Sequence, residues 1–97
     1  MKIRIGNIRY DVRHVLGLVD GDRKLDGQIR HTDCEIKLEA TLRGQVYWQT
    51  IIHEALHAML IQTGQEMEES GIDPLAYQMY GFIMDNKGLI RKMMEDK

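Results

Sequence analysis

Residues 53–57 have the sequence H-E-A-L-H, so two histidines lie four positions apart and a glutamate directly follows the first one. On a helix, side chains at positions i and i+4 lie on one face about one turn apart, so both imidazoles can reach a single ion. Two neutral imidazoles and one carboxylate suit zinc and leave a fourth position for water. The spacing therefore predicts zinc bound by His53 and His57, with Glu54 beside the metal as the general base.

A pair of structural histidines with satisfied hydrogen bonds is the alternative interpretation of this pattern. The match lies inside a strongly periodic helical segment, and the two histidines lie at the edge of its apolar stripe. Imidazoles beside an apolar stripe are costly to bury without polar partners. This context favours the metal site over the structural pair.

A catalytic zinc needs a third protein ligand, and four acidic side chains shortly downstream are candidates: Glu66, Glu68, Glu69 and Asp73. The first two are typical of a solvated charge run. Glu69 and Asp73 are four residues apart and share one face if the second helix begins early. Glu69 could then reach the metal while Asp73 holds an imidazole N–H. The alternatives are a solvated Glu69 and an Asp73 that caps the helix.

Two tyrosines follow on the same helical face as Asp73. A phenol near the metal could donate a hydrogen bond to a developing oxyanion. Tyr77 is better explained as a core residue with its hydroxyl at the surface, whereas Tyr80 fits either role. His14 and His31 have no partner at ligand spacing, so we expect them to be surface or satisfied histidines.

The elements that must position these residues change their period near the middle of the chain. Apolar residues alternate over 2–12, and their phase flips at Gly6-Asn7, which predicts two short strands around a tight turn or bulge. A loop is expected over 20–27, followed by strands over 28–31 and 35–39. After Gly44 the period becomes helical and ends near Gly64.

The second helix has two possible starts, with either Ser70 or Asp73 as its cap. It runs toward Asn86 and Gly88, and a short final helix can follow. Strands first and helices afterwards predict an α+β fold, in which helices pack on one face of a small antiparallel sheet.

Length and composition favour a single globular domain over residues 1–97, because a chain of 97 residues is too short for two cores. Lysine and arginine total 13 against 15 acidic residues, so the basic surface of a nucleic-acid-binding protein is not expected. No apolar run approaches the length of a membrane span, and the N-terminus lacks a signal-peptide core. With one cysteine, the chain is expected to be a soluble, cytoplasmic protein.

Several segments then combine into a family resemblance. They are K-I-R-I-G-N-I-R-Y-D-V, G-Q-I, I-K-L, Q-T-I-I-H-E-A-L-H-A and E-S-G-I-D-P-L-A-x-x-M-Y-x-F-I-M-D-N, which together cover most of residues 2–86. Their order resembles the compact zincin-like metallopeptidases, many of which are encoded by phages and mobile elements. These proteins are related to the minigluzincins and the ImmA/IrrE-type peptidases.

The resemblance implies that His53 and His57 bind zinc and that Glu54 is the catalytic glutamate. It further implies Glu69 as the third ligand, followed by Asp73, and matches Tyr80 less securely to a transition-state donor. The strand over 35–39 would be the sheet edge that aligns an extended substrate.

The resulting prediction is a zinc metallopeptidase that hydrolyses a peptide or protein substrate with Glu54 as general base. One alternative is a zinc-binding interaction module without hydrolytic activity, in which the ion only stabilises the helices. A metal-free adaptor is the other.

Overall fold

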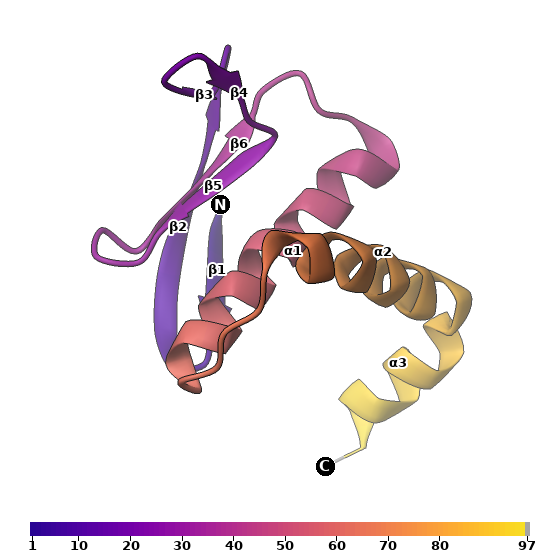
Figure 1. The fold of residues 1–97 in the computed structure, drawn as a ribbon. Coiled ribbons are helices and arrows are strands. Elements are labelled where there is room, and N and C mark those ends of the chain that lie inside the picture. The colour runs from indigo at the N-terminus through magenta and orange to yellow at the C-terminus, as the bar shows by residue number, and fades with distance from the viewer. Residues whose placement is uncertain (97) are drawn as a thin grey trace.

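The N-terminal half of the chain forms a four-stranded sheet and a separate small hairpin in the computed structural model, which describes residues 1–96 (Figure 1). The sheet strands are β1 (Lys2–Ile5), β2 (Ile8–Val15), β5 (Gly27–Arg30) and β6 (Glu35–Glu39). The hairpin strands are β3 (Val19–Asp20) and β4 (Arg23–Lys24), which begin one residue before the segment 20–27 that was expected to be a loop. The strands predicted from the sequence are thus confirmed to within one residue over 27–39.

The turn between β1 and β2 lies where the apolar phase flips. Gly6 has a φ of +61°, a conformation that glycine adopts without strain. The antiparallel register places Ile3 opposite Tyr10 and Ile5 opposite Ile8. Because the phase changes at the turn, Ile5 and Tyr10 are both buried in the sheet core. The predicted tight turn is confirmed.

The α+β class is confirmed, but the sheet is mixed where a purely antiparallel one was expected. The strand order is β1-β2-β6-β5, with β6 antiparallel to β5 and parallel to β2. The chain leaves β2, forms the β3–β4 hairpin and returns as β5 on the outside, so β6 inserts between β2 and β5. Residues 35–39 therefore pair on both sides, and the expectation that they form the substrate-aligning edge is wrong. The edge is β5.

Three helices follow: α1 (Gly44–Gln62), α2 (Glu69–Asp85) and α3 (Lys87–Glu95). The end of α1 is a Schellman motif, as the glycine predicted. Gly64 has a φ of +70°, its N–H donates to the Ile61 carbonyl, and the Gln65 N–H donates to the Leu60 carbonyl at 2.8 Å.

Neither predicted start of α2 is correct, because the helix begins at Glu69 with Glu68 as its N-cap residue. Pro74 consequently lies inside the helix, where it has no N–H for a backbone hydrogen bond. The early turn is explained by Ile72, which is fully buried and packs with Leu56 of α1. This side chain is buried with the turn before Pro74 in a helical conformation. The early start also places Glu69 and Asp73 on one helical face.

The helix α1 is the centre of the molecule and packs on two sides. One face meets the sheet core through Ala58 and its partly buried neighbours Ile51 and Ala55. A second face meets α2 through Leu56, flanked by Ile52 and Leu60. In Figure 1 the sheet and α2 lie on different sides of α1. The strip of α1 between the two packed faces is left to border a cleft.

The helix α3 takes no part in positioning that cleft. It has no buried residue and turns away from the rest of the fold in Figure 1. Within residues 1–96, no helix combines the length and the apolar character needed to cross a membrane.

Candidate metal centre

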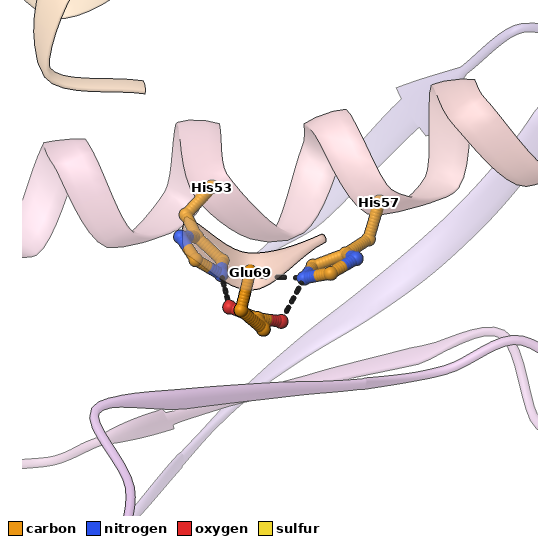
Figure 2. A group of neighbouring side chains, drawn as sticks. All are labelled: His53, His57 and Glu69. Carbon is orange, nitrogen blue, oxygen red and sulfur yellow. Dashed lines mark hydrogen bonds and ion pairs between the residues drawn. The ribbon is translucent and has the colours of Figure 1, made fainter. Parts of the chain in front are cut away.

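His53 and His57 project from the strip of α1 that lies between its two packed faces. Their ring nitrogens Nε2 are 3.2 Å apart, and both rings are partly buried. Figure 2 shows the two imidazoles pointing toward the same carboxylate. The local helical spacing therefore brings the rings together, as the sequence predicts.

The carboxylate belongs to Glu69, the first residue of α2. One of its oxygens lies 2.9 Å from Nε2 of His53 and the other 2.6 Å from Nε2 of His57. One turn later, Asp73 places Oδ1 at 2.7 Å from Nδ1 of His53. His53, His57 and Glu69 each offer a ligand atom within 4.8 Å of the others, a group able to hold a metal ion. All four residues are thus brought together at one place.

The distances from the two nitrogens of His53 to carboxylate oxygens indicate why this cluster fits a cation when the ring is neutral. An imidazole in its neutral form has one N–H, and Nδ1 of His53 must donate it to the Asp73 carboxylate. Nε2 of His53 then carries a lone pair and faces a carboxylate oxygen of Glu69 at 2.9 Å. Two lone-pair atoms repel each other at that distance unless a positive charge, either a second ring proton or a bound cation, lies between them. A divalent cation with nitrogen and oxygen ligands satisfies this requirement.

The two carboxylates are exposed, which limits what they contribute to the protein without an ion. The Glu69 side chain is 67% exposed and that of Asp73 is 74% exposed. Pairs in such positions stabilise a fold by only about 0–1 kcal/mol. The cluster is therefore a weak structural contact, and a bound ion would add a much stronger link between α1 and α2.

Glu54 lies one residue after His53 but points toward β5. It is only 5% exposed, and its carboxyl group lies against the backbone of Gly27. Burial raises the pKa of this carboxyl group to about 7. The positive charge of His53 opposes that shift, whereas the negative charges of Glu69 and Asp73 add to it. Glu54 is thus an acid that can hold or release a proton near neutral pH.

This pKa predicts how the stability of the metal-free protein changes with pH. The folded state retains the Glu54 proton up to about pH 7, while the unfolded chain releases it near the ordinary value of 4.5. The contribution of Glu54 to stability is therefore fully present below pH 4.5 and is lost as the pH rises through 7. Removing the ionisable group in Glu54→Gln should abolish this loss, which amounts to about 3 kcal/mol.

Urea unfolding of both metal-free proteins at pH 5 and pH 8 measures this effect. We expect Glu54→Gln to gain stability relative to wild type on going from pH 5 to pH 8. Effects of the amide itself are present at both pH values and cancel in the comparison. If wild type and Glu54→Gln differed in unfolding free energy by the same amount at both pH values, the raised pKa of Glu54 would be contradicted.

Gly27 of β5 allows the close approach of Glu54. A Cβ atom at this position would lie 2.8 Å from Cγ2 of Thr50 and 2.9 Å from Oε2 of Glu54. Gly27→Ala should therefore displace both side chains and destabilise the fold by about 1–3 kcal/mol, measured by thermal unfolding. Gly81→Ala in α2 is the matched control, because no atom lies within 4 Å of its added Cβ. Equal stabilities for the two variants would argue against this tight contact.

A cleft of about 890 Å³ surrounds the cluster. Its walls come from the β3–β4 hairpin, β5, α1 and the start of α2, and they include His53, His57, Glu54 and Glu69. The residues Gly27, Gln28 and Ile29 place the edge strand along one side.

The chain matches no protein-family model, no curated protein and no solved structure. The family resemblance therefore stays a prediction that rests on the motifs themselves.

The cleft lining does not include Tyr80, Glu66 or Glu68. Tyr80 lies seven residues beyond Asp73, about 10 Å along α2, and is not among the lining residues. Glu66 lies in the exposed connector before α2, and Glu68 is the N-cap residue of that helix. Within residues 1–96, the acidic groups that line the cleft from α2 are Glu69 and Asp73.

His31 was expected to lie at the surface or to be satisfied, but it lines the cleft. It directly follows β5, and its Nδ1 atom is buried without a hydrogen-bond partner among the described residues. Burial lowers the pKa of His31, and the positive charge of His57 lowers it further. The sequence gives no sign that His31 reaches the cleft, because it has no partner at ligand spacing. The pairing of β5 with β6 brings it there.

Proposed function

We propose that the protein is a zinc-dependent peptide hydrolase. His53, His57 and Glu69 would hold the metal, and Glu54 would act as general base. One observation carries the proposal: three potential ligand atoms lie within 4.8 Å of one another in a cleft that Glu54 and the free edge of β5 also line. The resemblance to compact zincin-like metallopeptidases supports the same activity.

The donor set favours zinc over calcium or magnesium. Two imidazole nitrogens and one carboxylate are typical of catalytic zinc sites, whereas calcium and magnesium prefer oxygen ligands. When bound, zinc supplies Lewis-acid chemistry that acidifies water and polarises a carbonyl group. Asp73 accepts the Nδ1 proton of His53 and so holds that ring with Nε2 directed at the ion.

In this proposal, Glu54 moves the proton during hydrolysis. Its carboxylate accepts a proton from the attacking water, and the resulting carboxylic acid delivers that proton to the leaving amine. A pKa of about 7 suits both steps, because neither protonation state is strongly disfavoured near neutral pH. A cation beside the carboxyl group favours its charged form, which is the form that accepts the proton.

The edge strand in the cleft wall favours an extended peptide as the substrate. The strand β5 is an edge of the sheet, and its residues Gly27, Gln28 and Ile29 line the cleft. Unpaired main-chain groups on such an edge can hydrogen-bond an added strand. We therefore infer that the substrate lies along β5. This strand has the role that the family resemblance implied for residues 35–39.

The test uses protein purified without a polyhistidine tag and stripped of metal. Wild-type protein with no metal, with one equivalent of zinc, or with magnesium is incubated with a diverse mixture of peptides. Mass spectrometry then detects cleavage products. We expect new peptide termini only with zinc. Zinc binding without any cleavage would favour the interaction module, and failure to bind zinc would favour the metal-free adaptor.

A further inference from the structure

We propose that His31 is a further catalytic residue of this cleft, whose Nε2–H donates a hydrogen bond to the reacting carbonyl oxygen of the substrate. The proposal rests on the proposed peptide hydrolysis. It assigns to His31 the role of transition-state donor, for which the sequence had suggested Tyr80. It starts from the one side-chain atom in residues 1–96 that is both buried and unpartnered, Nδ1 of His31.

The position of His31 is fixed by the turn between β5 and β6. Its carbonyl accepts a hydrogen bond from the Cys34 backbone N–H at 3.3 Å and a second from the Cys34 thiol at 3.6 Å. Cys34 has a φ of +51°, which closes this turn tightly. The imidazole therefore extends from a constrained backbone beside the edge strand, and it lines the same cleft as His57.

The two ring nitrogens of His31 have different surroundings. Nδ1 is buried without a partner among the described residues, and an unpartnered N–H is rarer in protein interiors than an unpartnered acceptor. We therefore assign the proton of the neutral ring to Nε2. Nε2 is neither sealed from solvent nor hydrogen-bonded among the described residues, so an N–H on this atom is free to donate to a group in the cleft that His31 lines.

His31 is not a fourth ligand of the metal group. The three ligand atoms that lie within 4.8 Å of one another come from His53, His57 and Glu69, and His31 is outside that set. His31 thus lines the same cleft as these three ligands without belonging to their set, and it lies on the wall formed by the edge strand β5. A peptide aligned along β5 would run past His31, because this residue directly follows the strand and lines the cleft.

A hydrogen bond from this position favours the transition state over the bound substrate. The carbonyl oxygen becomes negative as water adds to the carbonyl carbon, so an N–H directed at it binds more strongly during the reaction. The proton stays on His31 throughout, and no covalent step is added. Removing one donor of this kind typically lowers kcat by about 10²–10³-fold.

Three substitutions of the zinc-loaded full chain test the role of the donor. His31→Gln keeps an N–H donor near the position of Nε2, His31→Asn keeps one only near Nδ1, and His31→Ala keeps none. His14→Gln is the control, because His14 is hydrogen-bonded to Tyr47 at 2.9 Å and does not line the cleft. For each variant, kcat, KM, zinc affinity and melting temperature are measured with a peptide that the wild type cleaves.

We expect kcat to fall by about 10²–10³-fold in the alanine and asparagine variants, with KM and zinc affinity within twofold of wild type. The glutamine variant should recover at least tenfold of that loss. A second readout is binding of an N-phosphoryl leucine amide, whose tetrahedral oxygens resemble the transition state. The affinity of His31→Ala for this ligand should be lower than that of wild type, while its affinity for acetohydroxamate should equal that of wild type.

Other outcomes overturn the proposal in identifiable ways. Loss of zinc affinity in His31→Ala would make the residue a ligand, and equal losses for glutamine and alanine would indicate a purely structural role. An unchanged kcat would exclude the donor while leaving the proposed hydrolase intact. If the zinc-loaded wild type cleaves no peptide, the proposed function fails. Unchanged affinity of His31→Ala for the phosphoryl ligand would then overturn the donor role as well.

Discussion

Replacing Glu54 with glutamine is expected to reduce zinc-dependent peptide cleavage by about 10²–10⁴-fold while zinc stays bound. Glutamine has nearly the same shape as glutamate but cannot accept the proton from water. Glu54 does not belong to the group of His53, His57 and Glu69, so the variant should retain the metal. Initial cleavage rates and zinc content of the purified proteins are the two measurements.

A matched variant controls for the change in charge. Glu66→Gln removes the same charge from the exposed connector before α2, outside the cleft, and should cleave at the wild-type rate. If Glu54→Gln were as active as Glu66→Gln, Glu54 would lose its role as general base. If neither variant nor wild type cleaves but all bind zinc, the non-hydrolytic interaction module becomes the better interpretation.

How much of the site could be predicted depends on how local its geometry is. His53 and His57 are four residues apart on one helix, so their convergence follows from helical spacing alone. The same holds for the turn at Gly6 and for the end of α1 at Gly64, where a single residue type determines the backbone conformation. These features required no knowledge of tertiary structure.

The partners from α2 depended on where that helix begins, and local signals gave the wrong start. Ser70 and Asp73 both have the chemistry of a cap, and Pro74 is typical of the first helical position. The burial of Ile72 against α1 outweighs these preferences and moves the start to Glu69. Packing between helices therefore places Glu69 and Asp73 at His53.

The features that sequence reasoning missed arise from pairing between distant segments. The parallel alignment of β2 with β6 makes β5 the free edge, and β5 then carries His31 to the cleft. A histidine without a neighbour at ligand spacing gives no sign of this in one sequence. Tyr80 is the converse case, since it shares a helical face with Asp73 but lies too far along α2.

Zinc binding is expected to stabilise the fold strongly, and His57→Ala should abolish that effect. At a free zinc concentration of about 1,000 times Kd, binding to the folded state adds about 4 kcal/mol. For a domain of this size, that corresponds to a rise in melting temperature of about 15 °C or more. His57→Ala removes one of the three ligands and should leave the melting temperature nearly independent of zinc.

His14→Ala is the control for nonspecific binding, because His14 lies in β2 and contacts Tyr47 instead of the cleft. It should retain the full zinc-dependent rise in melting temperature measured by calorimetry. A rise in His57→Ala as large as in wild type would exclude this cluster as the zinc site.

The prediction depends on the position of the ligands, because His53 and His57 lie on α1 and Glu69 on α2. An ion held by all three joins two helices that otherwise meet through a small apolar cluster and exposed carboxylates, so separating them would require its release.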